Sequence, residues 1–340
     1  MNAPKILALQ FKYFGDAVLM TPALRALRQH FQDSELHLLV PEEIAPLFQN
    51  LPWLDRVWAM PRKRGSAGLA ETWPVIRALR RERFDRSVDF ASNDRGAIVS
   101  FFIRAKRRLG WAERGGFWGR KFCYNNRVAP EAKLQYEAAR LAQLLSGWQL
   151  PPAASLELEI RANPKLDVPA AQLLPEPVVL CHMAASQPNR QWPVGRWAEL
   201  YHRAAAAGMP VAFTTAPGAS GQALTEELKR LVPTAPVLPP LPQLALFLAV
   251  LQRAKIFISG DTGPLHFAAG LGVSTLSLFG PSYPERFAPV GRKHLFLRAA
   301  RCPCGPGVSR CLNANFCLAG ILPEEVLRCL QMLVTSNLTC

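Results

Sequence analysis

The sequence predicts an α/β protein with two doubly wound, parallel-sheet domains. Short apolar runs alternate with helical patterns along most of the 340-residue chain, and such alternation indicates crossover units and a parallel sheet. A proline-rich segment interrupts the alternation, which then restarts. The length exceeds what one ordinary core needs and suits two domains.

The first domain is expected over residues 1–150. ILALQF is a buried strand, and GDAVLMTPALRALRQHF follows as a helix in which Leu24, Leu27 and Phe31 recur at helical spacing. The next expected strands are ELHLLV, VWAM and RSVDFA, with helical patterns over 69–82 and near 95–105.

Residues 151–177, which include PPAAS and NPKLDVPAAQLLPEP, are expected to form an interdomain linker. The second domain is expected over 178–340. Its predicted strands are VVLCHM, PVAFTT, KIFISG and VSTLSLFG, and its predicted helices are GRWAELYHRAAAAG, SGQALTEELKRLV, LPQLALFLAVLQRA and GPLHFAAGLG. A closing helix, PEEVLRCLQMLV, could pack back on the first domain.

Composition indicates a globular chain, because 49% of residues are hydrophobic and 19% are charged. MNAPKILALQF lacks the pattern of a signal peptide, and the longest dense apolar run, LALFLAVL, is shorter than the roughly 20 residues of a membrane span. We therefore expect a soluble cytoplasmic protein.

The net charge of +15 is unevenly distributed. Residues 1–150 carry +10, and between 104 and 127 eight basic residues face one acid, Glu113. Such a surface attracts polyanions, among them nucleic acid, anionic lipid and phosphorylated saccharide. A generally basic, solvated surface is the alternative.

Four of the eight cysteines, Cys302, Cys304, Cys311 and Cys317, cluster near the C-terminus. Their spacing lacks the paired C-x2-C units usual for structural zinc, so no metal site is predicted. Metal, redox and purely structural roles stay open for the cluster.

A carboxylate and a glycine, Asp16 and Gly15, lie between the first strand and the first helix. Asp16 is either an ordinary helix N-cap or a base that accepts a proton from a substrate hydroxyl. The turn lacks G-x-G-x-x-G, and the chain lacks a Walker motif, which disfavours dinucleotide chemistry and P-loop hydrolysis.

The stretch SGDTGPLHFAAGLG predicts an anion site at a helix start. Backbone amides near Thr262 and Gly263 would be free there, and Pro264 suits a first-turn position where no amide donor is needed. His266 either donates to a phosphate oxygen or is simply packed. Asp261 repels phosphate and fits sugar hydroxyls or the turn itself.

A further loop, in HMAASQPNRQWPVGRWAEL, follows another predicted strand and carries Arg190. This arginine either clamps a diphosphate or is a surface residue. In open parallel sheets ligands bind at the carboxyl ends of strands, where all these stretches lie.

FGDAVLMTPALRAL, RQWPVGRWAEL and SGDTGPLHFAAGLGVSTLSLFGPSYPERFAPVG resemble the lipopolysaccharide core heptosyltransferases of glycosyltransferase family 9, over Lys5 to about Val334. VDFASNDRGAIVSFFIRAKRRLGW and the cysteine cluster look more like the second and third heptosyltransferase types. The resemblance implies a GT-B fold of two Rossmann-like domains facing a cleft. It also implies inverting, metal-independent transfer of L-glycero-D-manno-heptose from ADP-heptose to the lipopolysaccharide inner core, with no cofactor.

The resemblance assigns Asp16 as the general base. It places Thr262, Gly263, Pro264 and His266 at the donor diphosphate and Asp261 near the donor sugar, and Arg190 falls where relatives often carry lysine. The basic first domain makes Arg62, Lys63, Arg64 and Arg120 candidate acceptor contacts and suggests peripheral contact with the anionic cytoplasmic face of the inner membrane.

One departure concerns the loop 216–225, which lacks the glutamate that relatives place against the nucleoside; the first acid is Glu226. Transfer of a different nucleotide-activated sugar is therefore the main alternative. A non-catalytic polyanion-binding module, with GGFWGRKFCY as its aromatic and basic segment, is a minor one. No nucleic-acid partner is predicted.

Overall fold

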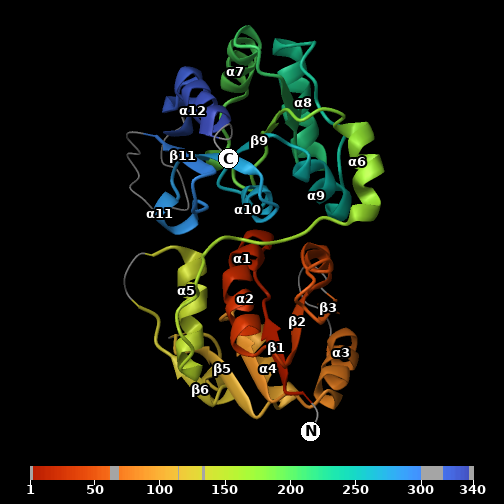
Figure 1. Cartoon of the computed structure of the whole chain (residues 1–340), viewed down its shortest axis with the longest axis vertical. Coiled ribbons are helices and arrows are strands. Elements are labelled where there is room, and N and C mark those ends of the chain that lie inside the picture. The colour runs from red at the N-terminus through yellow and green to blue at the C-terminus, as the bar shows by residue number, and fades with distance from the viewer. Residues whose placement is uncertain (1–2, 62–68, 114, 132–134, 300–316, 337–340) are drawn as a thin grey trace. The chain divides into compact units, whose positions relative to one another are not determined.

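The computed structural model describes residues 3–61, 69–113, 115–131, 135–299 and 317–336. The chain divides into two compact units, Met1–Leu156 (unit 1) and Glu157–Cys340 (unit 2). Figure 1 shows each unit as a parallel sheet with helices around it. The expected class, α/β with two Rossmann-like parallel sheets, is confirmed.

Unit 1 contains a six-stranded parallel sheet in the order β3-β2-β1-β4-β5-β6. Its strands are β1 (Lys5–Leu9), β2 (Glu35–Pro41), β3 (Arg56–Met60), β4 (Arg86–Asp89), β5 (Arg107–Trp111) and β6 (Asn126–Val128). Its helices are α1 (Phe14–Leu19), α2 (Thr21–His30), η1 (Glu42–Leu47), α3 (Leu69–Arg81), α4 (Asp94–Ile103), η2 (Arg120–Cys123), α5 (Glu137–Gln143) and η3 (Leu144–Trp148).

Unit 2 contains a five-stranded parallel sheet in the order β11-β10-β9-β7-β8. Its strands are β7 (Val179–His182), β8 (Val211–Thr214), β9 (Ile256–Gly260), β10 (Ser274–Phe279) and β11 (His294–Arg298). Its helices are η4 (Pro164–Leu166), α6 (Asp167–Leu173), η5 (Pro188–Arg190), α7 (Val194–Ala206), α8 (Ala219–Leu231), α9 (Leu244–Gln252), α10 (Gly263–Gly270), α11 (Pro284–Phe287), η6 (Cys317–Gly320) and α12 (Pro323–Ser336).

Both sheets are doubly wound, which fixes where a ligand can bind. In unit 1, α1, α2 and α5 pack together and α3 packs on α4; in unit 2, α12, α7 and α8 form one group and α6, α9 and α10 another. The strand order reverses between β1 and β4 in unit 1 and between β7 and β9 in unit 2. Such switch points, at the carboxyl ends of the strands, are the usual ligand sites of open α/β sheets.

The central strands are mostly buried because helices cover both faces of each sheet. The buried centre of β1 is ILAL, and all five residues of β9, IFISG, are buried. In unit 2 the core also holds Trp192 and Trp197, whose rings meet edge to face at 4.7 Å between centroids.

The structure adds β5, β6, β11 and α5 to the predicted elements, and three predicted segments differ from expectation. The single helix expected after the first strand divides at Met20 into α1 and α2. The range expected as a linker contains η4 and α6, and α6 packs on α9. The last helix, α12, buries Val326, Leu330 and Leu333 in the core of unit 2.

Candidate active site

The switch point of unit 2 brings together two of the predicted donor-binding segments. The loop after β7 contains η5, whose last residue is Arg190, and the turn after β9 contains Asp261. Arg190 Nη1 donates to Asp261 Oδ2 at 2.9 Å. Asp261 is 7% exposed, so the expected repulsion between this carboxylate and an anion is offset by the guanidinium beside it.

Helix α10 begins at the same place. Thr262 is its N-cap, with extended backbone and no side-chain capping bond, and Gly263 and Pro264 are its first two residues. The N–H groups at a helix start have no intrahelical acceptor, and the helix dipole favours negative charge there. Thr262 Oγ1 is buried and has no hydrogen-bond partner among the described residues. This helix start can therefore hold an anion.

Buried polar atoms without partners gather at the carboxyl ends of three neighbouring strands, β10, β9 and β7. Buried polar groups in native proteins almost always have a hydrogen-bond partner. Seven such atoms, which lack one among the described residues, are His182 Nδ1, Gln187 Oε1, Asn189 Oδ1, Arg190 Nε, Thr262 Oγ1, His266 Nδ1 and Ser282 Oγ. A polar ligand at this edge of the sheet would supply the missing bonds.

Two histidines at this edge are neutral at physiological pH. Burial lowers the pKa of His182 to about 4, and burial, partly opposed by Asp261, lowers the pKa of His266 to about 4. His266 is 3% exposed. Each imidazole thus offers a neutral hydrogen-bond donor or acceptor rather than a positive charge.

Acidification should destabilise the fold partly through His266. The pKa of His266 in the folded state lies below the ordinary 6.5. Its contribution to the free energy of unfolding is therefore complete above pH 6.5 and is lost as the pH falls toward 4. At pH 5 the loss is about 2 kcal/mol. Burial raises the pKa of Asp89 to about 6, so protonation of Asp89 stabilises the folded state as the pH falls and opposes the effect of His266. The test therefore compares the pH dependence of the free energy of unfolding, from urea denaturation, between wild type and His266→Gln. The variant should show the shallower decline; equal declines would contradict the assignment.

Two strand-end glycines let η5 and η6 lie against the sheet. A Cβ on Gly260 would lie 2.4 Å from the carbonyl oxygen of Arg190, and one on Gly280 would lie 2.9 Å from Cys317 Sγ. The position of Arg190 therefore depends on the absence of a side chain at Gly260.

Gly260→Ala is expected to destabilise unit 2 by about 1–3 kcal/mol and to weaken nucleotide binding, because the backbone of η5 must move. Gly195→Ala is the control, since a Cβ there meets nothing within 4 Å. Thermal denaturation and ADP titration of both variants test this. Equal melting temperatures for the two would show that η5 does not depend on Gly260.

The candidate base lies at the switch point of unit 1. Asp16 is the third residue of α1, whose N-cap is Tyr13, and its side chain is half-buried. The interpretation of Asp16 as the N-cap is therefore wrong: the N-cap is Tyr13, three residues earlier. In the first turn its carboxylate is still favoured by the helix dipole.

A charged network links this region to the wall of a cavity. Arg140 on α5 binds Glu137 through Nε at 3.1 Å and Nη2 at 2.7 Å, and Glu113 through Nη1 at 3.3 Å. Burial opposes the charged form of Arg140, but Glu137, Glu113 and Asp16 together raise its pKa above the ordinary value. Arg140 also lies 4.9 Å from the centroid of the Trp111 ring.

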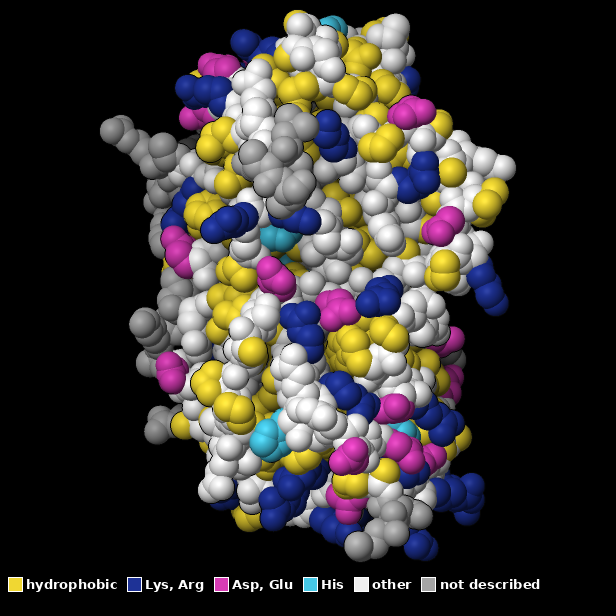
Figure 2. Space-filling view, viewed as in Figure 1, with side chains coloured by type: hydrophobic (Ala, Val, Ile, Leu, Met, Phe, Trp, Pro, Cys, Tyr) yellow, Lys and Arg dark blue, Asp and Glu magenta, His cyan; other side chains and the backbone are white. Residues whose placement is uncertain are grey.

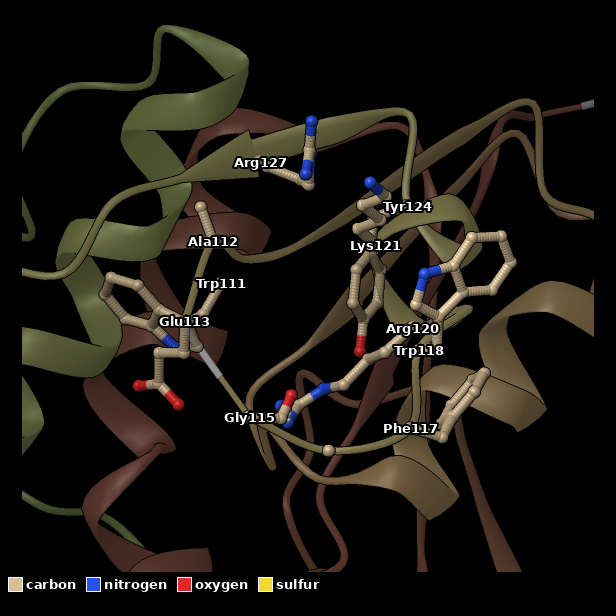
Figure 3. Close-up of a pocket in the computed structure, with 11 residues that line it drawn as sticks. Trp111, Ala112, Glu113, Gly115, Phe117, Trp118, Arg120, Lys121, Tyr124 and Arg127 are labelled. Carbon is tan, nitrogen blue, oxygen red and sulfur yellow. Dashed lines mark hydrogen bonds between the residues drawn. The ribbon is translucent and has the colours of Figure 1, made fainter.

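The cavity has a volume of about 320 Å³ and lies at the carboxyl ends of β5 and η2. Figure 3 shows Trp111 and Glu113 on one side, Phe117 and Trp118 on the other, and Arg120 between them. Lys121, Tyr124 and Arg127 complete the labelled polar and aromatic lining. Of the predicted acceptor contacts, Arg120 is therefore a cavity residue.

The charge of the cavity is positive overall. Glu113 accepts from Arg140 and from Ser92 Oγ, at 2.5 Å, and Arg120 Nη2 donates to Ser92 Oγ at 3.0 Å. Lys121 and Arg127 are exposed cations. Aromatic rings beside cations suit a sugar that carries phosphate or carboxylate.

Below the cavity lies a buried pair that the sequence analysis missed. Tyr124 donates to Asp89 Oδ2 at 2.5 Å, and the Ala91 amide donates to Asp89 Oδ1 at 2.9 Å. Burial raises the pKa of Asp89 to about 6 despite these bonds. Asp89 is the last residue of β4, and a charged residue within the predicted strand RSVDFA was the available signal.

Three predicted acceptor contacts, Arg62, Lys63 and Arg64, lie outside the described residues, as do Cys302, Cys304 and Cys311. Cys317 is described and is partly buried. Within the described ranges no group of three His, Cys, Asp or Glu side chains is arranged to hold a metal ion. Likewise, no helix in the described part of the chain is long and apolar enough to span a membrane.

Two doubly wound parallel-sheet units, one of them with a helix start at its switch point that can hold an anion, are typical of nucleotide-binding α/β enzymes. The family model of glycosyltransferase family 9 (heptosyltransferase) matches residues 72–315. The chain belongs to this family and is a glycosyltransferase.

Relatives and solved structures agree with this assignment. Lipopolysaccharide heptosyltransferase 2 of Salmonella typhimurium is 24% identical over 305 residues, which cover 86% of this chain and 88% of that protein. The fold matches a family 9 glycosyltransferase from Veillonella parvula with a TM-score of 0.86 at 18% identity, covering 99% and 98% of the two chains. It also matches E. coli heptosyltransferase WaaC, solved with ADP-2-deoxy-2-fluoro heptose, with a TM-score of 0.72 at 19% identity over 96% and 99%.

Proposed function

We propose that this enzyme transfers L-glycero-D-manno-heptose from ADP-heptose to a hydroxyl of the lipopolysaccharide inner core. The unpartnered polar atoms at the switch point of unit 2, beside Arg190 and the start of α10, support a diphosphate-bearing donor. The family and the ADP-sugar bound to a protein of the same fold support the donor class. Asp261, next to Arg190, would contact the donor sugar.

The reaction needs a base and a stabilised leaving group. Asp16 would remove the proton of the acceptor hydroxyl, whose oxygen then bonds to the anomeric carbon while the carbon–oxygen bond to ADP breaks on the opposite face, which inverts the configuration. The charge on departing ADP would be stabilised by Arg190, the amides at Gly263 and the Thr262 hydroxyl. Neutral His266 would add one hydrogen bond.

The acceptor is expected to carry negative charge. Arg120, Lys121 and Arg127 at the cavity of unit 1 would bind a phosphate or carboxylate of the inner core, and the aromatic walls would pack against sugar rings. Arg62, Lys63 and Arg64 remain candidates for further contacts. We also infer a cytoplasmic enzyme in peripheral contact with the inner membrane, where such an acceptor is anchored.

Transfer should not depend on a divalent metal, because the charge of the leaving group is offset by protein groups. Initial rates of heptose transfer measured with EDTA and with added Mg²⁺ or Mn²⁺ are expected to agree within about twofold. Loss of activity in EDTA, restored by one of these ions, would contradict metal-independent transfer.

The alternative of another nucleotide sugar is tested by donor selectivity. Calorimetric titration with ADP, UDP and GDP should show ADP binding most tightly, and ADP-heptose should be consumed only when acceptor is present. Tighter binding of UDP or GDP would favour the alternative. The non-catalytic polyanion module is not favoured, because the chain is a glycosyltransferase; on the face in Figure 2 basic side chains are also interleaved with acidic ones.

A further inference from the structure

Unit 1 exposes a stripe of apolar side chains on helix α4. Ile98, Phe101 and Phe102 are 37–46% exposed and are spaced i, i+3 and i+4, which places them on one face of the helix. The opposite side of α4 faces the interior of the fold, since Gly96, Ser100 and Ile103 are buried. The exposed stripe is therefore additional to the face that the fold needs for its core.

Neighbouring elements extend the stripe on both sides. On α3, Trp73 meets Phe102 edge to face at 5.6 Å between ring centroids. Toward η2, Ala97, one turn before Phe101, packs on Cys123 and Tyr124.

Residues 118–122 contribute the other edge. Phe122 and Trp118 are 58% and 86% exposed, and their rings lie 5.9 Å apart. We call the combined surface the aromatic face; it comprises Trp73, Ile98, Phe101, Phe102, Trp118 and Phe122.

Cations border the aromatic face. Arg77 and Arg80 follow Trp73 at i+4 and i+7 on α3, and both are exposed. Lys121 Nζ lies 5.0 Å from the Phe122 ring centroid, and Arg104 at the end of α4 is exposed. Exposed Trp and Phe next to Lys and Arg are typical of segments that lie in the headgroup region of an anionic bilayer.

We propose that the aromatic face docks this enzyme onto an anionic lipid bilayer, with its rings at headgroup level and its bordering cations on lipid phosphates. A second copy of the chain fits less well, because self-pairing of the face would bring its cationic borders together. Single-stranded nucleic acid also fits less well, because stacking needs open ring faces, and these rings meet edge to face around an aliphatic Ile98.

Only the purpose of docking rests on the proposed function: docking would bring the cavity that contains Arg120 to a membrane-anchored acceptor. Trp118 belongs both to the cavity lining and to the aromatic face. Docking itself requires neither donor nor acceptor and can be measured without them.

The test is flotation of the full chain with phosphatidylethanolamine–phosphatidylglycerol vesicles. Trp73→Ala combined with Phe101→Ala, which lies outside the cavity, should lower vesicle binding by about tenfold. Val168→Ala combined with Leu231→Ala is the matched control, since it removes two exposed apolar side chains from unit 2 and should bind as wild type does. Binding should also fall with added salt and in vesicles without phosphatidylglycerol.

Equal vesicle binding by both double variants would overturn the proposal. So would loss of dimerisation or of oligonucleotide binding, rather than of vesicle binding, in Trp73→Ala/Phe101→Ala. If that variant does not fold, two other measurements test docking: vesicle binding by Phe122→Ala, and quenching of the tryptophan fluorescence of wild type by brominated lipid. Absence of quenching in wild type would overturn the proposal. Transfer to a delipidated acceptor, expected to be unchanged in Trp73→Ala/Phe101→Ala, tests the proposed function separately.

Discussion

Replacing Asp16 with asparagine is expected to slow heptose transfer by about 1,000-fold while leaving ADP binding near the wild-type level. Asparagine keeps the size of the side chain in the first turn of α1 but cannot accept the proton of the acceptor hydroxyl. Steady-state transfer rates and ADP titration of the same preparations measure the two effects.

Asp16→Glu is the informative companion variant. It restores the carboxylate but moves it by one methylene, so partial activity is expected if geometry and proton acceptance both matter. A transfer rate within about threefold of wild type for Asp16→Asn would remove the carboxylate from the role of base. A loss of ADP binding in parallel with activity would instead assign Asp16 to donor binding.

Arg190→Ala should weaken ADP binding by about 100-fold. The change removes a cation from the diphosphate site and leaves Asp261, which is 7% exposed, without the guanidinium it contacts at 2.9 Å. An uncompensated buried charge opposes both folding and anion binding. The ADP affinity of Arg190→Lys should lie between those of wild type and Arg190→Ala, because lysine keeps the charge but not the planar guanidinium group.

Arg196→Ala provides the control for this prediction. Arg196 lies on α7 and binds Glu199 at 3.3 Å, in a pair of which both side chains are over one-third exposed. Such surface pairs contribute little, so ADP affinity should be unchanged. If Arg190→Ala and Arg196→Ala bind ADP equally well, Arg190 holds only Asp261 and does not reach the nucleotide.

The sequence was sufficient for the fold class because most of the apolar runs are short, strand-like and separated by helical patterns, although β5, β6 and β11 were not predicted. Buried strands such as ILAL and IFISG can be recognised as nearly continuous apolar runs, since both faces of a parallel sheet are covered. The break at Met20 and the short helix α6 were not predicted. Short helices and helix breaks depend on tertiary packing, which the periodicity of apolar residues does not reveal.

The position of the candidate site was predictable where a strand end and a helix start coincide, as at Thr262 and Gly263. The Arg190–Asp261 pair was not, because the two residues are 71 positions apart and only the strand order places β7 beside β9. Gly260 carried no sequence signal for its contact with η5. The Asp89–Tyr124 pair depends in the same way on the neighbouring positions of β4 and β5.

The most direct test is a crystal structure of the enzyme soaked with ADP. The account predicts the diphosphate at the start of α10, within hydrogen-bond distance of the amide of Gly263 and the side chains of Thr262 and Arg190. A diphosphate bound instead in the cavity lined by Arg120, or anywhere away from the β7–β9 switch point, would contradict it.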